Sequence, residues 1–253
     1  MSEIGKTVLV TGAAAGIGAG IAERFSEAGY SVAAFDIDGA GATRMAERLR
    51  AHAPAIAIQG DVAVEENARE AVTKTVRDLG SLDVLVNNAG IEVSGSVSDL
   101  TPTAWDRQIA VNLRGAYLMS KYAVEQMRGR GGAIIHISSV HAFVSWQGIA
   151  AYDATKAGLL GLTRAMALDH GPEKIRVNAI CPGYIDTPLM ERWLASVPDR
   201  EETMRQVLSY HPLGRIGTPR DIGEAALFLA SDAASFVSGA FLVVDGAMSV
   251  AGH

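Results

Sequence analysis

Short apolar runs alternate with longer segments of helical periodicity along most of the chain. The runs are rich in β-branched residues and are apolar at successive positions, so both faces of each strand are buried. Strands of this kind, separated by helices, predict a parallel sheet covered by helices on both sides. The predicted strands are residues 7–10, 31–36, 55–60, 82–86, 133–138, 175–180 and 241–244. The predicted helices are residues 17–28, 40–52, 64–79, 102–127, 149–170 and 219–230.

Seven such strands predict an α/β fold with one doubly wound, Rossmann-type domain over residues 1–253. No Pro/Ser-rich linker divides the chain, and no internal repeat is visible. The alternation is interrupted after the sixth strand, where residues 182–219 are rich in Pro, Met, Arg and Glu. We predict that residues 184–218 form a helical excursion that acts as a substrate lid over the carboxyl end of the sheet.

Composition narrows the class of partner. The chain has 253 residues, 49% of them hydrophobic, and a formal net charge of −6, with no run of five basic residues. The chain is therefore long and apolar enough to form a sizeable hydrophobic core. Neither a nucleic acid nor an anionic membrane is an expected partner, because both need a clustered positive face. No apolar leader or 18-residue apolar run is seen, and the single cysteine, Cys181, fits a reducing compartment. We expect a cytoplasmic protein with a small-molecule substrate.

Glycine is enriched, with 27 residues in the chain, and three of them mark a candidate nucleotide site. Gly12, Gly16 and Gly18 lie where the first predicted strand meets the first helix. A helix N-terminus with bare backbone N–H groups can receive a pyrophosphate there, and the missing side chains allow close approach. A glycine triplet alone is also compatible with a plain strand-to-helix turn.

Asp36 favours the nucleotide interpretation. It ends the second strand, 18 residues after Gly18, near the offset at which an acidic side chain meets the ribose hydroxyls of a dinucleotide. Its charge would repel a 2′-phosphate, and the flanking Ala15 and Ile37 offer no cation for one. The expected cofactor is NAD rather than NADP.

Polar and glycine residues also follow the third and fourth strands. Asp61 and Val62 come after the third strand, and Asn87, Asn88, Ala89 and Gly90 come after the fourth. Ligands of a doubly wound sheet bind at these carboxyl ends. Because Asn and Gly are also ordinary turn residues, each signal is weak by itself.

Together, the motifs resemble the short-chain dehydrogenase/reductase family over nearly the whole chain. They are Thr11-Gly12-x3-Gly16-Ile17-Gly18, Asn87-Asn88-Ala89-Gly90, Asn112, Ser139, Tyr152-x3-Lys156 and Pro182-Gly183. The residues expected to bind the cofactor, besides Asp36, are Gly12, Gly16, Ile17, Gly18, Asp61, Val62, Asn88, Ala89 and Gly90. The resemblance implies that Pro182, Gly183, Ile185 and Thr187 face the nicotinamide. It also implies a homotetramer.

The chemistry of alcohol oxidation explains the residue types. Tyr152 would take the hydroxyl proton, although a free Tyr with a pKa near ~10 is poorly ionised at neutral pH. Lys156, one helical turn away, supplies a positive charge that favours phenolate, and by resemblance it also binds the nicotinamide ribose. Ser139 would hydrogen-bond the substrate oxygen. Asn112 would by resemblance hold a water in a proton relay to Lys156; a helix-interior Asn facing solvent is the alternative.

The Tyr-x3-Lys spacing occurs twice, at Tyr117/Lys121 as well as at Tyr152/Lys156. Ser139 lies thirteen residues before Tyr152, whereas the same offset from Tyr117 gives an alanine. Tyr117 also lies within a predicted long helix, where an aromatic residue is usually core or interface packing. We therefore assign the catalytic pair to Tyr152 and Lys156.

Several polar and aromatic residues are candidates for the substrate pocket. Glu92 and His141, within Gly90-Ile91-Glu92 and Ser138-Ser139-Val140-His141, resemble the glucose 1-dehydrogenase branch of the family and suit a polyhydroxylated substrate. Solvent-facing loop residues are an equal alternative. Further candidates are Trp146, Gln147, Asp153 and Trp193. Asp153 departs from the Ser or Ala usual after the family's catalytic Tyr, and Trp193 could instead pack the lid onto the sheet.

These residues lead to three hypotheses. The first is an NAD-dependent dehydrogenase of an aldose or polyol. The second is a 3-oxoacyl or other carbonyl reductase on the same scaffold, a type that usually prefers NADPH. The third, a non-catalytic NAD-binding protein, is disfavoured because Asn112, Ser139, Tyr152 and Lys156 are all present. The histidines lack metal-ligand spacing, so no metal is expected.

Overall fold

Seven parallel strands form a single sheet in the computed structural model, which describes residues 5–250. Their order is β3-β2-β1-β4-β5-β6-β7, so the direction of winding reverses between β1 and β4. This confirms the predicted doubly wound architecture. The strands are β1 Thr7–Thr11, β2 Ser31–Asp36, β3 Ala55–Gln59, β4 Val84–Asn87, β5 Gly132–Ile137, β6 Ile175–Pro182 and β7 Phe241–Val244.

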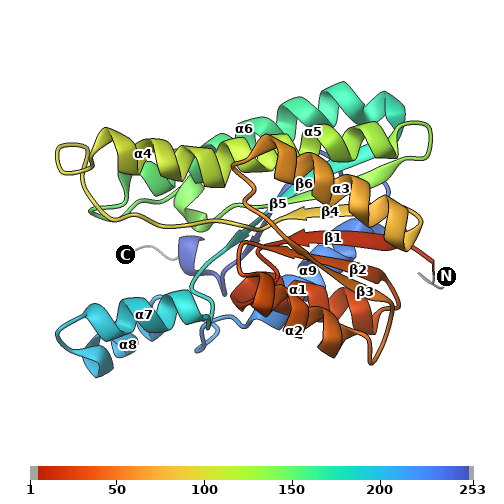
Figure 1. Ribbon diagram of the computed structural model, residues 1–253. Helices are drawn as coiled ribbons and strands as arrows, with labels where there is room; N and C mark the ends of the chain where they lie inside the picture. The colour runs from red at the N-terminus through yellow and green to blue at the C-terminus, as the bar shows by residue number, and fades with distance from the viewer. Residues whose placement is uncertain (1–4, 251–253) are drawn as a thin grey trace.

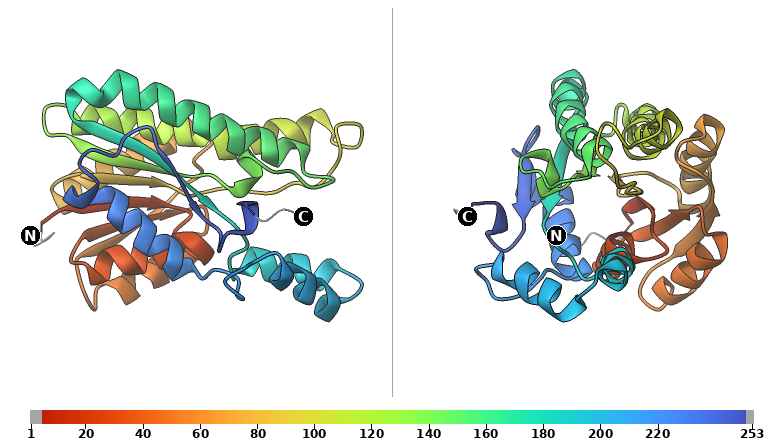
Figure 2. Two further views of the ribbon diagram at one scale, coloured as in Figure 1. Left: turned by 180° about the vertical axis from the view of Figure 1, so that it is seen from behind. Right: turned by 90° about the vertical axis from the view of Figure 1, so that its left-hand side faces the viewer.

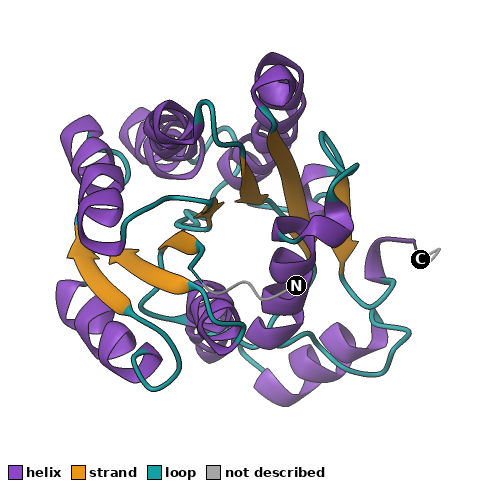
Figure 3. Ribbon diagram, turned by 90° about the vertical axis from the view of Figure 1, so that its right-hand side faces the viewer, coloured by secondary structure: helices purple, strands orange, loops and turns teal. Residues whose placement is uncertain are grey.

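Helices cover both faces of the sheet (Figure 1 and Figure 3). The helices are α1 Gly16–Glu27, α2 Gly39–Leu49, α3 Glu65–Leu79, α4 Pro102–Ile109, α5 Gly115–Met127, α6 Ala150–His170, α7 Pro188–Ser196, α8 Arg200–Ser209 and α9 Pro219–Ala230. Helices α1, α2 and α9 lie on one face, and α3, α5 and α6 lie on the other.

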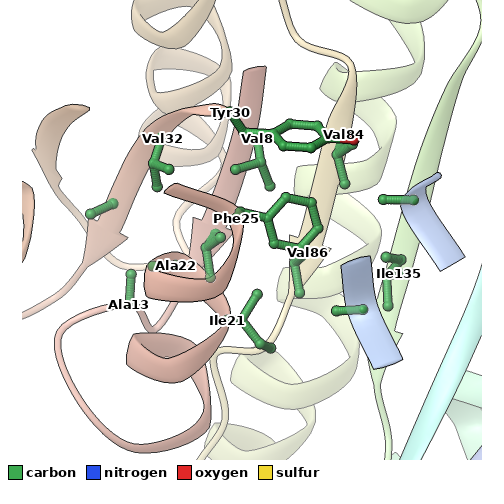
Figure 4. Close-up of a cluster of buried hydrophobic side chains, with 14 of the residues drawn as sticks. Val8, Ala13, Ile21, Ala22, Phe25, Tyr30, Val32, Val84, Val86 and Ile135 are labelled. Atoms are coloured by element: carbon green, nitrogen blue, oxygen red, sulfur yellow. The ribbon is translucent and has the colours of Figure 1, made fainter. Parts of the chain in front are cut away.

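Each face has its own hydrophobic core. Along β1, Val8 and Val10 belong to the cluster beneath α1, and Leu9 belongs to the cluster on the opposite face. The alternation follows from the two-residue period of a strand. Ile21 and Phe25, one turn apart on α1, point down onto the first cluster (Figure 4), where both are fully buried. The two cores hold the sheet, and with it the carboxyl ends of all strands, in one fixed arrangement.

The helical stretch predicted over residues 102–127 is confirmed, and it contains one irregular turn. A π-helical turn, Ala110–Arg114, separates α4 from α5 and contains Asn112. Turns of this kind are rare and often mark functional positions. Residue-by-residue helical periodicity cannot reveal it, because one extra residue in a turn hardly changes the pattern of apolar positions.

The excursion after β6 is helical, as predicted. Helices α7 and α8 form it and enclose a small apolar cluster of Met190, Leu194 and Val207. Both extend past the carboxyl ends of the strands, on the same side of the molecule as α4 (Figure 1 and Figure 2). Between residues 5 and 250, no helix combines the length and apolarity needed to cross a membrane.

A capping box starts α9. The Thr218 side chain accepts a hydrogen bond from the Asp221 amide, and the Asp221 carboxylate accepts one from the Thr218 amide. Arg215 binds both oxygens of that carboxylate at 2.8 Å and, with the hydrogen bonds from Thr218, holds the pKa of Asp221 well below its usual range. This box fixes the end of the excursion onto the helix that packs against α1.

Removing the cap should weaken the fold. Thr218→Ala loses one side of the box and should lower the free energy of unfolding by about 1 kcal/mol, measured by urea titration. Thr103→Ala, at an exposed position within α4, is the matched control and should not lower it. Because the pKa of Asp221 is depressed, its contribution is present at neutral pH and fades as pH falls below the ordinary Asp range. Equal loss in both variants would contradict a capping role.

Candidate active site

At the three glycines of the turn between β1 and α1, a side chain would be strained or would collide with its neighbours. Gly12 and Gly16 adopt positive φ angles of 66° and 58°. A Cβ on Gly18 would collide with the carbonyl oxygen of Gly12 and would lie 2.5 Å from Nδ2 of Asn88. Ile17 follows in the first turn of α1, and the N-cap residue makes no side-chain hydrogen bond to that helix. The first N–H groups of α1 are therefore free of a side-chain cap, which suits a phosphate group.

The loops after β1 and β4 are tied together at the point where the winding reverses. Thr11 Oγ1 accepts hydrogen bonds from the amides of Asn88 and Ala89 at 2.9 and 3.0 Å. Asn88 Nδ2 donates to the carbonyl of Thr11 at 2.9 Å, and Gly90 follows in the same loop. The structure thus brings the predicted residues 12, 88 and 89 together. Thr11 begins the motif of the glycine turn, but its role in joining the two loops was not predicted from the sequence.

Asp36 lies beside the glycine turn. Its Oδ2 accepts from the amide of Ala14 at 2.9 Å, and its Oδ1 accepts from the amide of Asp38 at 2.9 Å. The neighbouring Ile37 is 62% exposed, so an apolar side chain rather than a cation follows the carboxylate. The glycine turn, residues 12–18, and the loop of residues 88–90 together form a cradle. The contact with Ala14 places the negative charge of Asp36 at the edge of this cradle.

Asp61 and Val62 lie after β3. Asp61 pairs with Arg107 of α4, with Oδ2 and Nη2 2.9 Å apart. Val62 is buried against α5, where a Cβ on Gly115 would lie 2.8 Å from Val62 Cγ2. These contacts hold the segment after β3 against α4 and α5.

The segment after β6 closes on the glycine turn. Pro182 ends β6, and Gly183 N donates to the carbonyl of Val244. Ile185 is buried, and Thr187 begins α7 by accepting a hydrogen bond from the Met190 amide at 3.3 Å. A Cβ on Gly16 would lie 3.5 Å from Thr187 Cβ. The predicted nicotinamide-facing segment therefore lies against the predicted phosphate turn.

Tyr152 and Lys156 occupy the first two turns of α6. Lys156 Nζ lies 5.2 Å from the centre of the Tyr152 ring and donates to the carbonyl of Ile137, at the end of β5, at 2.9 Å. Ser139 lies two residues after β5, and its hydroxyl acts to lower the pKa of Tyr152. Three residue types that alcohol oxidation requires are thus assembled from one helix and the end of one strand.

The environment shifts both pKa values. The surrounding protein removes Tyr152 from water, and this desolvation raises the pKa of its phenol above the ordinary value. The negative charge of Glu92 acts in the same direction, and the Ser139 hydroxyl opposes both effects. Burial lowers the pKa of Lys156 to about 8. Lys156 is therefore still largely charged at neutral pH, and its charge favours the phenolate form of Tyr152.

Asn112 is buried, so a solvent-facing Asn is wrong. Its Oδ1 accepts from the amide of Ile91 at 2.8 Å, and its Nδ2 donates to the carbonyl of Ile91 at 2.8 Å and to Thr155 Oγ1 at 3.3 Å. The side chain joins the loop after β4 to helix α6. A role in a water relay to Lys156 stays a prediction.

The second Tyr-x3-Lys pair does not form a site. Tyr117 is 49% exposed on α5, so packing into the core of this chain is wrong for it. Lys121 instead pairs with Glu65 of α3 at 2.9 Å. No hydroxyl stands at the equivalent of Ser139, as the sequence indicated.

The candidate substrate residues gather beside Tyr152. The ring of His141 lies 5.4 Å from the Tyr152 ring and 4.7 Å from the Trp146 ring, centre to centre. His141 Nδ1 lies 3.0 Å from Oδ1 of Asp153. Glu92, on the loop after β4, acts electrostatically on Tyr152. Gln147 is exposed in the loop before α6.

Aromatic rings continue from Trp146 into the excursion. Tyr184 lies edge-on to Trp146 at 6.4 Å and stacks on Trp193 at 5.9 Å. His211, after α8, meets the same Tyr184 ring at 5.9 Å. Neither Tyr184 nor His211 was predicted from the sequence to belong to this aromatic surface. The surface brings together rings from the loop before α6, from α7 and from the segment after α8, and no local pattern links these segments.

Comparisons with known proteins agree with this geometry. A family model described as enoyl-(acyl carrier protein) reductase matches residues 12–249. The chain is 41% identical to 2-(S)-hydroxypropyl-CoM dehydrogenase 3 of Xanthobacter autotrophicus over 96% of each chain. It is 41% identical to L-rhamnose 1-dehydrogenase (NAD(P)(+)) of Azotobacter vinelandii over 98% of each. A crystal structure assigned as a short-chain alcohol dehydrogenase from Sinorhizobium meliloti 1021 superposes with a TM-score of 0.93, at 35% identity and 98% coverage of each chain.

The fold and the site define an oxidoreductase with a nicotinamide cofactor, acting on CH–OH groups. The chain belongs to the short-chain dehydrogenase/reductase family.

The charge of Glu92 should set the pH dependence of the reaction. With Tyr152 as the predicted base, alcohol oxidation requires its deprotonated form, and kcat/KM should rise with pH. Glu92→Gln removes a negative charge that raises the pKa of Tyr152, and should move the rising limb to lower pH by about half a unit. Glu125→Gln, exposed on α5, is the control and should leave the limb in place. A shift to higher pH would contradict the assignment of Tyr152 as the base.

Proposed function

We propose that this protein is an NAD-dependent dehydrogenase that oxidises a secondary alcohol or hemiacetal hydroxyl of a small polyhydroxylated substrate, an aldose or a polyol. The observation that carries the substrate class is the polar lining beside Tyr152. His141 and Asp153 are hydrogen-bonded there, and Glu92 acts on the same phenol. Hydroxyl groups can both donate to and accept from such a lining. The similarity to L-rhamnose 1-dehydrogenase supports a sugar substrate.

The residues of the chain account for the proton chemistry. Tyr152 accepts the proton of the substrate hydroxyl, and the charge of buried Lys156 favours the phenolate that does so. Ser139 donates a hydrogen bond to the same oxygen and stabilises the charge that develops on it. The cofactor, when bound, would take up the hydride that leaves the carbon. In the reverse direction Tyr152 returns the proton to the carbonyl oxygen.

The cradle fits NAD. The glycine turn leaves space for the pyrophosphate at the start of α1, and the loop of residues 88–90 borders that turn. Asp61 and Val62 would contact another part of the cofactor. Asp36 would accept from the adenosine ribose hydroxyls, since each carboxylate oxygen has a lone pair beyond the one that its backbone donor uses. The same carboxylate would repel a 2′-phosphate. Thr187 and Ile185 would hold the carboxamide end of the nicotinamide.

A carbonyl reductase on the same scaffold is the second candidate. The matching family model, described as an acyl-carrier-protein reductase, favours it. The carboxylates Glu92 and Asp153 count against it, because an acidic lining disfavours the anionic carriers of acyl groups.

Tyr152→Phe tests the catalytic assignment. Without the phenolic hydroxyl the proposed base is absent, so kcat should fall by about a thousandfold, within the range of a general-base contribution. NAD affinity, measured by titration calorimetry, should change little. Tyr117→Phe, the same change in the other Tyr-x3-Lys pair, is the matched control and should keep full activity. Retained turnover in Tyr152→Phe would mean that the base is a different residue.

The ratio of kcat/KM with NADP to that with NAD tests the role of Asp36. Repulsion between the carboxylate and a 2′-phosphate should make NAD the better cofactor by about a hundredfold or more. Asp36→Asn removes the charge at nearly constant volume and should narrow the difference. A wild-type preference for NADP would contradict this account and favour the carbonyl reductase.

A further inference from the structure

Asp153 and His141 form a hydrogen-bonded pair beside the catalytic tyrosine. Asp153 follows Tyr152 on α6, and His141 is the second residue after Ser139. His141 Nδ1 and Asp153 Oδ1 are 3.0 Å apart, and the second oxygen, Oδ2, accepts from the Ser145 hydroxyl. The side chains of His141 and Asp153 are 21% and 19% exposed. Both partners are thus largely enclosed, and one edge of the pair remains accessible.

Three features surround the carboxylate of Asp153. It lies in the first turn of α6, where the positive end of the helix dipole stabilises a negative charge. Ser145 adds a hydrogen bond to the carboxylate. Lys156, one turn further along α6, adds a positive charge on the same side of the helix N-terminus.

An ionised carboxylate determines which tautomer His141 adopts. A carboxylate only accepts hydrogen bonds, so the ring nitrogen that faces Asp153 must carry the hydrogen. Burial lowers the pKa of His141 and nearby Lys156 acts in the same direction, while the hydrogen bond and charge of Asp153 oppose them. The imidazole is therefore neutral at neutral pH, and Nε2 bears a lone pair.

Nε2 is left as an acceptor next to the reacting centre. The hydrogen bond with Asp153 is the one that the His141 ring makes within residues 5–250. The ring meets Tyr152 edge-to-face with the centres 5.4 Å apart, and the centre of the Trp146 ring lies 4.7 Å from that of His141. A hydroxyl on a carbon next to the reacting one can reach His141 while the reacting hydroxyl contacts Tyr152.

We propose that Asp153 is a positioning residue that acts through His141 and makes the enzyme select alcohols that carry a second hydroxyl next to the reacting one. Asp153 holds the imidazole with Nε2 as acceptor, and that neighbouring hydroxyl donates to it. This proposal rests on the proposed function and deepens it, because it names the feature of the substrate that the pocket recognises. A substrate that lacks the second hydroxyl leaves Nε2 without a donor.

A pair of matched alcohols measures the selection. The probes are cyclohexanol and cyclohexane-1,2-diol, in its cis and trans forms, with NAD reduction followed at 340 nm. The wild-type kcat/KM for the better diol should exceed that for cyclohexanol by about tenfold, which is the factor expected of one hydrogen bond. A ratio near one would overturn the proposal.

Asp153→Asn tests whether the carboxylate sets the tautomer. An amide can donate to the ring nitrogen as well as accept from it, so Nε2 no longer stays an acceptor. The ratio of diol to cyclohexanol should fall by about tenfold, mainly through the KM of the diol. Asp169→Asn, the same change at an exposed position near the end of α6, is the matched control and should keep the wild-type ratio. If Asp153→Asn lowers kcat/KM equally for both alcohols, its role is structural and the proposal is wrong.

A double-mutant cycle tests whether Asp153 acts through His141. His141→Ala should lower the same ratio by a similar factor, and adding Asp153→Asn should lower it no further. Fully additive losses would overturn the proposal. Asp153→Ser, which restores a residue type usual in the family at this position, serves as a second variant if the Asn variant is unstable, and should also lower the ratio.

The outcome for cyclohexanol separates this proposal from the proposed function. Turnover of cyclohexanol that depends on Tyr152, without a preference for the diol, would overturn the role of Asp153 and leave the dehydrogenase assignment intact. If wild-type protein reduces NAD with neither alcohol nor with any aldose or polyol, the proposed function fails and this proposal fails with it.

Discussion

The arrangement of the site depends on the burial of the Lys156 ammonium group beside Tyr152. Burial of a charge is costly unless the surroundings compensate for it. Here one backbone carbonyl, that of Ile137, accepts from Nζ, and the Tyr152 ring lies 5.2 Å from it. These contacts replace only part of the hydration that the ammonium group loses on burial, so the pKa of Lys156 falls to about 8. A negative charge beside the ammonium group would stabilise its charged form. Ionisation of Tyr152 supplies that charge.

The rest of the fold holds this pair and the glycine turn in fixed positions relative to each other. Thr11 and Asn88 join the loops after β1 and β4, and Asn112 joins the loop after β4 to α6. Both connections run between segments held by the two hydrophobic cores. The first uses backbone groups of both loops, and the second joins the backbone of Ile91 to the hydroxyl of Thr155 through the Asn112 side chain. The sheet therefore positions these loops.

The aromatic surface beside Tyr152 extends into the excursion. The rings of His141 and Trp146 lie beside Tyr152, and Tyr184 and Trp193 continue this surface. The excursion has its own small core, and it is tied to the rest of the molecule by buried Ile185 and by the ion pair of Arg215 with Asp221. Under the proposed function, the residues that move the proton therefore lie next to those that contact the substrate.

The architecture and the places where its strands and helices end can be predicted from the sequence. Period-two burial and helical periodicity are local properties, and the glycine turn, Asp36 and the Tyr152/Lys156 pair lie at strand and helix ends that these periodicities locate. The burial of Asn112 could not be predicted, because it depends on contacts with Ile91 and Thr155 from distant segments. The π-helical turn around Asn112 also leaves no mark in the periodicity. The same holds for the pairing of His141 with Asp153 and for the stacking of Tyr184 on Trp193. Side-chain partners twelve or nine residues apart, across a loop or a turn, leave no periodic signal in the chain, whereas the elements that carry them do.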